Sequence, residues 1–327
     1  MPQYKNETNV SLPMAVWLAT DTYDHNDDPF TISATSLLKS PRQMVLARRL
    51  KPADVPVELS SLVASKMGTA IHEGVEHAWV HNYKQAMKDL GYPKGAINSV
   101  LVNPEPEELF DGCIPVYLEK RSSKKVGKYT VSGKFDFVFD GRIDDVKSTG
   151  VFTFQNKTND EKYIQQGSIY RWLNPDIVTS DVMAIQYIFT DWQAMRAKGN
   201  DPTYPKTRLH EEILNLYTVK QTEAFVARKI RLLDELEHTP EPELPLCNDE
   251  ELWRKAPSWK YYKNPEKMSR STKNFDNQLE AEQRFIADKG VGVIVQTGGE
   301  VVACKYCNVA SVCTQRLALI EDGSLKV

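Results

Sequence analysis

The chain has 327 residues, 41% of them hydrophobic, and a formal net charge of −3. This composition indicates a soluble, folded protein with room for one large domain or two ordinary ones, and it excludes a wholly basic nucleic-acid coat protein while leaving a local basic groove open. No apolar run reaches about 18 residues, and the N-terminus lacks the pattern of a secretory signal. We therefore expect a cytoplasmic protein without a membrane partner.

The N-terminal part of the chain contains two predicted helical stretches. Residues 1–30 are polar and irregular and indicate an N-terminal extension. The stretch 32–50 has a proline interruption followed by an amphipathic pattern, which predicts a helix. Residues 60–90 carry a long helical pattern that ends where Gly91 and Pro93 follow.

Five strands are predicted in the middle of the chain. Residues 113–120, 128–139 and 142–149 are rich in strand-forming residues and are separated by short turns, which predicts a meander. Residues 180–190 and 208–219 have the same character and predict two further strands.

Helices are predicted between and after these strands. Residues 158–173 and the amphipathic stretch 221–238, which has an acidic start, are typical of helices. The composition changes after residues 239–245, and one more helical stretch follows at 275–290. This order of elements predicts an α/β protein whose mixed sheet has helices on both faces.

Charged residues interrupt the apolar pattern of the predicted strands at one place. Asp136 and Asp145 lie near strand ends, and Lys147 follows Asp145 by two positions, so the last two side chains point to the same side. Charges on strands are usually a solvated face. Carboxylates on adjacent strands can instead hold Mg²⁺, which prefers oxygen ligands, and the carbonyl oxygen of Val146 is a further candidate ligand.

Residues on the neighbouring predicted helices extend this pattern. The helix over 60–90 carries His72, and the helix over 158–173 carries Gln166 and Tyr170 four positions apart, which places both on one face. In chain order the pattern is Gly68-x3-His72, Gly133-x2-Asp136, Asp145-x-Lys147 and Gln166-x3-Tyr170.

The pattern resembles the PD-(D/E)XK nuclease superfamily, and within it the RecB-like exonuclease group. The resemblance covers residues 31–175 by motif and most of the remainder by order of elements. It implies a restriction-endonuclease-like fold, with a mixed β-sheet core flanked by helices at residues 31–240. A cysteine-clipped C-terminal segment would follow at residues 241–327.

The resemblance also implies a metal-dependent phosphodiesterase. Four residues would hold Mg²⁺ or Mn²⁺: His72, Asp136, Asp145 and, through its carbonyl oxygen, Val146. Lys147 would be the catalytic lysine beside the two aspartates. Gln166 and Tyr170 would complete the catalytic set and line the substrate channel.

Three acidic neighbours of this set are interpreted separately. Asp144 should face away from Asp145 on a strand, and we interpret it as structural. Glu119 could join the acidic cluster, but an exposed strand position is the preferred interpretation. Glu76, one helical turn after His72, either supports that histidine from behind or is simply exposed.

Three cysteines within ten residues, Cys304, Cys307 and Cys313, predict a metal site near the C-terminus. Four thiolates complete a zinc site or a [4Fe–4S] cluster. The tail resembles that of iron–sulfur nucleases of the RecB-like group, among them the CRISPR adaptation nucleases and the AddB-type helicase-nucleases. Their first cysteine lies upstream of the nuclease core, in a helix resembling residues 40–50, and we place Met44 at that position.

A fourth cysteine ligand must then come from elsewhere, because a thioether is a poor substitute. Cys247 is the candidate, and Cys113 is the other option, although it precedes a predicted strand and is typical of a small buried residue. With Cys247 the cysteine set would close the C-terminal segment on itself. The residues leave zinc and iron–sulfur open, and the resemblance favours iron–sulfur.

Two basic groups are candidates for contact with DNA phosphates, and each is equally well a solvated turn. The first lies at a predicted hairpin tip, residues 119–128. The second consists of Lys263, Lys267, Arg270 and Lys273. Trp259, Tyr261 and Tyr262 precede this second group and suit either base stacking or a core.

Together these features predict a Mg²⁺- or Mn²⁺-dependent DNA nuclease, an exonuclease that hydrolyses phosphodiester bonds at DNA ends or in single strands during recombination, repair or replication. No GxxxxGK[ST] loop is present, so a motor would be a separate helicase or recombination protein. The size and build resemble bacteriophage nucleases, which act in the host cytoplasm. The alternatives are a non-catalytic nucleic-acid-binding protein and an interaction module of a replication or repair assembly, stabilised by a metal cluster.

Overall fold

The computed structural model describes residues 4–21, 26, 28–50 and 56–326, and the chain divides into two compact units. Unit 1 comprises Met1–Leu38 and Pro52–Arg231, and unit 2 comprises Lys39–Lys51 and Leu232–Val327. Part of the predicted N-terminal extension, residues 1–3, 22–25 and 27, lies outside the described residues. The predicted domain division at residue 240 stays a prediction.

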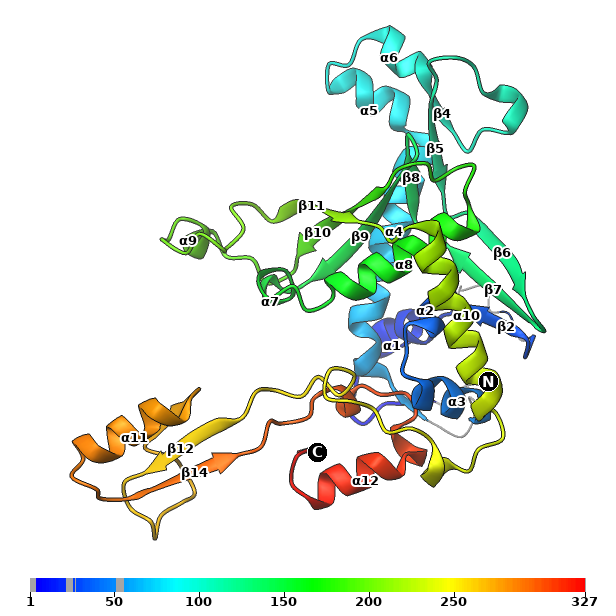
Figure 1. Ribbon diagram of the computed structural model, residues 1–327. Helices are drawn as coiled ribbons and strands as arrows, with labels where there is room; N and C mark the ends of the chain where they lie inside the picture. The colour runs from blue at the N-terminus through cyan, green and yellow to red at the C-terminus, as the bar shows by residue number, and fades with distance from the viewer. Residues whose placement is uncertain (1–3, 22–25, 27, 51–55, 327) are drawn as a thin grey trace. The chain divides into compact units, whose positions relative to one another are not determined.

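Unit 1 is built on a six-stranded mixed sheet, as the sequence predicts (Figure 1). Its strands, in spatial order, are β11 (Leu209–Asn215), β10 (Val182–Phe189), β9 (Arg142–Thr149), β8 (Phe137–Phe139), β5 (Ile114–Leu118) and β4 (Val100–Val102). The pairs β9–β10 and β4–β5 are parallel, and the other three pairs are antiparallel. The predicted mixed α/β architecture with flanking helices is therefore confirmed.

Two smaller sheets also belong to unit 1. One has the order β2 (Thr31–Ser33), β7 (Tyr129–Lys134) and β6 (Arg121–Val126), and the other pairs β1 (Tyr4–Lys5) with β3 (Val57–Glu58). The single strand predicted over 128–139 is thus divided, and its halves, β7 and β8, enter different sheets. Asp136 lies at the point where the chain passes from one sheet to the other.

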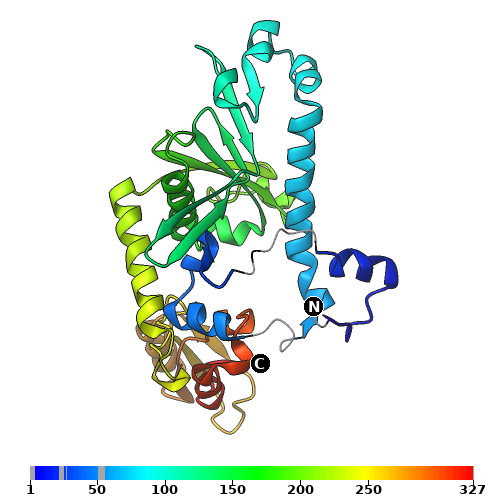
Figure 2. The same ribbon diagram turned by 90° about the vertical axis from the view of Figure 1, so that its right-hand side faces the viewer.

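Helices cover both faces of the six-stranded sheet. The helix predicted over 60–90 is present as α4 (Val63–His81) and α5 (Tyr83–Asp89), divided at Asn82, and the helix predicted over 158–173 is α8 (Asp160–Leu173). Figures 1 and 2 show α4 and α8 on opposite faces of the sheet. The remaining helices of unit 1 are α1 (Leu12–Ala19), α2 (Ala34–Leu37), α6 (Lys94–Ser99), α7 (Val151–Gln155) and α9 (Ala194–Ala197).

The apolar interior of unit 1 lies between the sheet and these helices. Val116, Leu118 and Phe137 are buried on β5 and β8, and Trp79 of α4 packs edge-on against Phe137 at 5.1 Å between ring centroids. Burial of such side chains stabilises the fold by about 1.5–3 kcal/mol each. In the described part of the chain, none of the helices is long and apolar enough to cross a membrane.

Unit 2 combines short helices with a separate three-stranded sheet. It holds α3 (Pro41–Arg49), which Pro41 begins at the favoured first position, and α12 (Thr314–Glu321). The sheet has the order β13 (Lys273–Phe275), β12 (Ser258–Tyr262) and β14 (Val293–Thr297), and α11 (Gln278–Ala287) packs on it (Figure 1). The helix α10 (Val219–Leu236) contains the boundary between the two units.

Candidate active site and cysteine region

The strand β9 carries an aspartate and a lysine that face the same side of the sheet. Asp145 is only 2% exposed, and its Oδ2 lies 2.6 Å from the ammonium nitrogen of Lys147. The same ammonium lies 5.5 Å from the ring centroid of Tyr163 on α8. A buried carboxylate requires a charged or metal partner. The pair of Asp145 and Lys147 therefore differs from the apolar side chains that normally fill a buried strand.

Asp136 and the main chain of β9 are both in contact with His72 of α4. The Nδ1 atom of His72 lies 3.2 Å from Asp136 Oδ2, and its Nε2 atom lies 3.1 Å from the carbonyl oxygen of Val146. His72 therefore joins the β7–β8 junction to β9. The structure brings together His72, Asp136, Asp145, Val146 and Lys147, which lie up to 75 positions apart in the sequence as separate motifs.

The two carboxylates of the site have pKa values that move in opposite directions. Burial raises the pKa of Asp145 to about 6, with a further upward contribution from Asp136 and a downward one from Lys147. Burial also acts to raise the pKa of Asp136, but His72 and Lys147 outweigh it and the pKa falls. Two neighbouring buried carboxylates repel each other when both are ionised. A bound divalent cation would offset this repulsion.

The two basic groups of the site are stabilised in their charged forms. The hydrogen bond to Asp136 raises the pKa of His72 against the effect of burial. For Lys147, burial acts to lower the pKa, but the charges of Asp145 and Asp136 prevail and raise it. Lys147 is therefore a permanent cation at neutral pH, suited to an anionic substrate.

The donor atoms of the site fit a hard divalent cation. The Oδ2 atoms of Asp136 and Asp145 are buried, and each lies beside one basic group, His72 Nδ1 at 3.2 Å and Lys147 Nζ at 2.6 Å. One ligand atom each from His72, Glu119 and Asp136 lies within 4.8 Å of the other two. Carboxylate oxygens with an imidazole nitrogen suit Mg²⁺ and Mn²⁺, so the residues present fit the implied metal.

Glu119 belongs to this site, although the sequence favoured an exposed strand position for it. It directly follows β5, its φ is +50°, and its backbone N–H donates to the carbonyl oxygen of Asp136 at 3.0 Å. Its carboxylate forms an ion pair with Lys134. The pairing of β5 with β8 brings residue 119 to Asp136, and the local sequence pattern does not reveal this pairing. The feature of the sequence that could have indicated a site residue here is a carboxylate at the end of a strand.

The predicted pair on α8 is also formed. Gln166 Nε2 donates to the Tyr170 hydroxyl at 2.8 Å, so both side chains lie on one face of the helix as the spacing predicts. The ring of Tyr170 packs on Gly133 of β7, where an added Cβ atom would come within 3.0 Å of two ring carbons. Gly133 in the sequence pattern is therefore explained by close packing of Tyr170.

A cavity of about 520 Å³ opens beside these residues. His72, Asp136, Glu119 and Tyr170 line it together with Glu76, for which both interpretations stay open. The remaining lining residues are Asp21, Ser65, Lys66, Gly68, Thr69, Glu73 and Lys134. His72 and Asp136 are therefore accessible to a ligand from this cavity, whereas Asp145, Lys147 and Gln166 are not among its lining residues.

Asp144 has a different environment from its neighbour Asp145. It is 6% exposed and accepts hydrogen bonds from Arg142, at 2.7 and 3.0 Å, and from Gln186 at 2.8 Å. These contacts satisfy the carboxylate within the sheet, which agrees with its interpretation as a structural residue.

The cysteines do not form the tight cluster that the sequence predicts. All five are free thiols, and among the described residues no three cysteine sulfurs lie within 4.8 Å of one another. Around a single zinc ion, tetrahedral geometry would place thiolate sulfurs about 3.8 Å apart. Cys113 lies in unit 1, whereas Cys247 lies in unit 2 with the C-terminal three.

The four cysteines of unit 2 nevertheless influence one another. Burial raises the pKa of Cys304 to about 11, with further upward contributions from Cys307, Cys313 and Cys247 and a downward one from Arg316. The Nε atom of Arg316 is buried without a hydrogen-bond partner among the described residues. The four sulfurs thus share one neighbourhood that also contains an unsatisfied cationic group.

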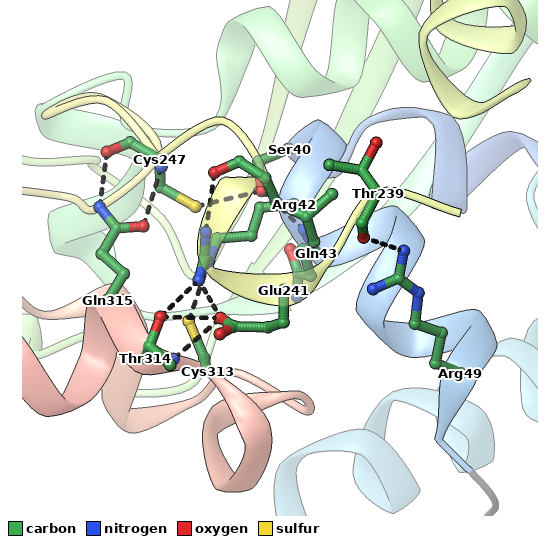
Figure 3. Close-up of polar contacts among 11 residues, drawn as sticks. Ser40, Arg42, Gln43, Arg49, Thr239, Glu241, Cys247, Cys313, Thr314 and Gln315 are labelled. Carbon is green, nitrogen blue, oxygen red and sulfur yellow. Dashed lines mark hydrogen bonds and ion pairs between the residues drawn. The ribbon is translucent and has the colours of Figure 1, made fainter. Parts of the chain in front are cut away.

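The helix α3 contacts these cysteines through residues other than the one predicted. Met44 is buried in the apolar interior, whereas Ser40 Oγ lies 3.2 Å from Cys247 Sγ and Arg42 Nε lies 3.2 Å from Cys313 Sγ (Figure 3). Ser40 is the N-cap residue of α3 and Arg42 lies in its first turn. The helix therefore contacts the cysteines through Ser40 and Arg42, and not through Met44, the residue that the resemblance aligned with the missing cysteine.

The two predicted basic groups have different surroundings. In the first, Lys124 and Lys125 are exposed on β6, and the Lys124 ammonium lies 4.4 Å from the ring centroid of Trp172. The second follows β12, but Tyr261 is fully buried and Tyr262 is 9% exposed. These tyrosines belong to the core of the small sheet, so base stacking is wrong for them.

Comparisons with known proteins assign no family to the chain. No family model matches it, and no curated protein matches it by sequence. A crystal structure of a protein named SSO0001 is 16% identical, with 71% of this chain and 90% of that chain covered and a TM-score of 0.41. A phage-related exonuclease from Haemophilus somnus 129PT is 17% identical, with 36% and 61% covered and a TM-score of 0.25. At such scores neither similarity determines what this chain does.

Proposed function

We propose that the protein is a Mg²⁺- or Mn²⁺-dependent DNA nuclease, an exonuclease that acts on DNA ends or single strands. The observation that carries this proposal is the meeting of Asp136, Asp145 and Lys147 at the junction of two sheets, with His72 between Asp136 and the carbonyl of Val146. Two acids, a cation and an imidazole form the set of groups that phosphodiester hydrolysis needs, and Asp136 and His72 of this set line an open cavity.

The metal would be held by His72, Asp136, Asp145 and the carbonyl oxygen of Val146. Among the described residues, ligand atoms of His72, Asp136 and Glu119 lie within 4.8 Å of one another, so Glu119 is an additional candidate ligand. When bound, a divalent ion neutralises charge on the phosphate and lowers the pKa of a coordinated water. The buried carboxylates of the two aspartates would supply the negative charge that such an ion requires.

Lys147 would position the phosphate. Its ammonium is held at Asp145 and above Tyr163, so it presents a fixed positive charge at the edge of the carboxylate pair. A preorganised cation stabilises the additional negative charge of the transition state without reorganisation during the reaction. Gln166 and Tyr170 would orient the strand that enters the cavity, since their mutual hydrogen bond holds both side chains in one rotamer.

DNA is the partner that these features favour, with a separate helicase or recombination protein as a further candidate. Lys124 and Lys125 on β6 are exposed and can contact backbone phosphates outside the cavity. Such contacts are independent of sequence, which suits an enzyme that degrades ends or single strands.

We further propose that Cys247, Cys304, Cys307 and Cys313 hold a metal group, a [4Fe–4S] cluster or zinc. Their shared neighbourhood and the unsatisfied Nε atom of Arg316 support this proposal. Such a group would stabilise a segment that has only a small apolar core.

The test is incubation of the full chain with end-labelled single- and double-stranded DNA in Mg²⁺, in Mn²⁺ and in a chelator. We expect degradation that requires the metal, and the ladder of labelled products gives the polarity. Binding of both DNAs without cleavage under any metal would contradict the catalytic proposal and favour a non-catalytic nucleic-acid-binding protein. A parallel RNA substrate determines whether the activity is restricted to DNA.

A further inference from the structure

The N-terminal end of α3 contacts two of the four cysteine sulfurs in unit 2, through Ser40 at Cys247 and through the Arg42 guanidinium, which donates to Cys313. We propose that Ser40 and Arg42 position Cys247 and Cys313 as thiolate ligands of a negatively charged metal centre. This inference rests on the cysteine part of the proposed function and adds the residues that position two of its four ligands.

Arg42 is the centre of this arrangement (Figure 3). It is 1% exposed, and its guanidinium donates through Nε to Cys313 Sγ at 3.2 Å and through Nη1 to the Leu244 carbonyl at 3.0 Å. Its Nη2 contacts Thr314 Oγ1 at 3.0 Å and the Glu241 carboxylate. The rigid guanidinium therefore fixes the direction of one N–H towards the sulfur, and such a bond is strongest when the sulfur is ionised.

Cys247 is fixed beside the Cys313 segment by Gln315. The Cys247 backbone N–H donates to Gln315 Oε1, and Gln315 Nε2 donates to the Cys247 carbonyl oxygen, both at 2.9 Å. On its other side, Cys247 Sγ lies 3.2 Å from Ser40 Oγ. Cys247, 66 positions before Cys313, is thus held to the Cys313 segment by two hydrogen bonds and to α3 by one polar contact.

The charges around the sulfurs match a negatively charged centre. Besides Arg42, α12 carries Arg316 three residues after Cys313, and its Nε atom is buried without a hydrogen-bond partner among the described residues. The carboxylate of Glu241 is already paired with Arg42. Four thiolates outweigh the positive charge of a zinc ion or an oxidised iron–sulfur cluster, so the bound centre would gain from these cations.

Replacement of Arg42 by Met tests the positioning role, with Arg49→Met as the matched control. Arg49 lies on the same helix, but among the described residues its guanidinium donates to the carbonyl oxygens of Leu236, Glu237 and Thr239, and the contact with Thr239 is drawn in Figure 3. The full-length variants are reconstituted anaerobically with iron and sulfide, and visible absorption, metal content and the rate of metal loss to a chelator are measured. We expect Arg42→Met to lose metal about 10-fold faster than the wild type or Arg49→Met.

A purely structural Arg42 would give a different result. In that case Arg42→Met would lower the melting temperature while the absorption spectrum and the rate of metal loss stayed at the wild-type values, which would overturn the proposal. The reduction potential adds an independent readout, since loss of an N–H···S bond should shift it to a more negative value.

A ligand exchange tests the placement of Cys247. Cys247→Ser should lose the visible absorption of the cluster, and Ser40→Cys combined with Cys247→Ser should regain it, because residue 40 reaches the same sulfur position. Full cluster content in Cys247→Ser, or failure of the wild type to bind iron or zinc, would contradict the assignment. DNA cleavage is scored separately, so failure of the nuclease proposal and failure of this one are distinguishable.

Discussion

The Lys147 ammonium and the Asp145 carboxylate lie 2.6 Å apart on one face of β9 and form an ion pair at the centre of the candidate site. Asp145 alone would be too costly to bury in charged form, and its pKa of about 6 expresses that cost. Lys147 reduces the cost without removing it. A bound metal ion would neutralise the remaining negative charge of the carboxylates, so these residues together favour a cation at the site.

Replacement of Lys147 by Met should abolish most of the cleavage while leaving metal binding in place. The ammonium contributes a positive charge at the phosphate and is not itself a metal ligand, so we expect kcat to fall by about 10²–10³. Lys157→Met is the control, because Lys157 pairs with Asp160 and Glu212 at the surface. Equal activity of the two variants would show that Lys147 has no role in the reaction.

Metal affinity should depend on pH. The pKa of Asp145 is raised to about 6 and that of His72 is raised above its ordinary value, so both groups carry protons in acid that a metal must displace. We expect Mn²⁺ affinity, measured calorimetrically, to weaken by up to about tenfold per pH unit and per proton as the pH falls from about 7.5 to about 5. An affinity independent of pH would exclude these two ligands.

At the scale of elements, the position of α8 against β7 depends on a glycine. Gly133→Ala would place a Cβ atom 2.9 Å from Leu173 Cδ1 and 3.0 Å from the Tyr170 ring. We expect the free energy of unfolding to fall by about 1–3 kcal/mol, because the packed helix must shift. Activity should fall as well, since Tyr170 moves with α8.

The matched control for this variant is Gly74→Ala on α4. An added Cβ atom at residue 74 meets nothing within 4 Å, and alanine is the better helix former, so this variant should gain about 0.5–1 kcal/mol. Urea unfolding of both variants measures the difference. A Gly133→Ala protein as stable as the wild type would contradict the packing account.

The sequence predicts elements well where one local pattern governs a whole segment. The helix α8 and the strands β9, β10 and β11 have clear periodicity and form within a few residues of the expected bounds. The prediction of one strand over 128–139 was wrong because alternation continues through Asp136 while the hydrogen-bond partner changes. Which strand each segment pairs with depends on the tertiary structure. The change of partner between β7 and β8 places Asp136 at the candidate site.

The same reasoning explains what was found and missed among the site residues. Asp136, Asp145 and Lys147 are candidates from their chemistry and strand positions, whereas the role of His72 is implied by the resemblance. Glu119 was considered but not preferred, because its left-handed backbone conformation, at a φ of +50°, turns the chain after β5 towards Asp136, and no glycine marks that turn. The strands β12 and β14 were missed because their pairing spans about 35 residues of sequence without a short hairpin signal.

At the scale of the whole molecule, the two units differ in what holds each together. Unit 1 has a large sheet with helices on both faces. The C-terminal segment of unit 2 has a small apolar cluster of Leu252, Val301, Leu319 and Leu325, against which Cys247 and Cys304 pack. A metal group at the cysteines, as proposed above, should therefore contribute to the stability of unit 2 far more than to that of unit 1.

Limited proteolysis of the metal-loaded chain tests this difference. Cys304→Ser should increase cutting within residues 247–303 several-fold and leave unit 1 as resistant as in the wild type. Cys113→Ser, in unit 1, serves as the control and should not change the cutting of unit 2. Identical digestion patterns for the wild type and Cys304→Ser would contradict a stabilising metal centre.

The most direct test of the central claim is the Mn²⁺-dependent rate of DNA cleavage in Asp145→Asn and Asp140→Asn, compared with the wild type. Both changes remove one carboxylate charge, but Asp145 is buried beside Lys147, whereas Asp140 is exposed in the turn between β8 and β9. Asparagine also tolerates the left-handed backbone of residue 140, whose φ is +47°. We predict that Asp145→Asn loses at least about 10²-fold in rate and that Asp140→Asn keeps the wild-type rate. Equal rates for the two variants would contradict the assignment of this site as the catalytic centre.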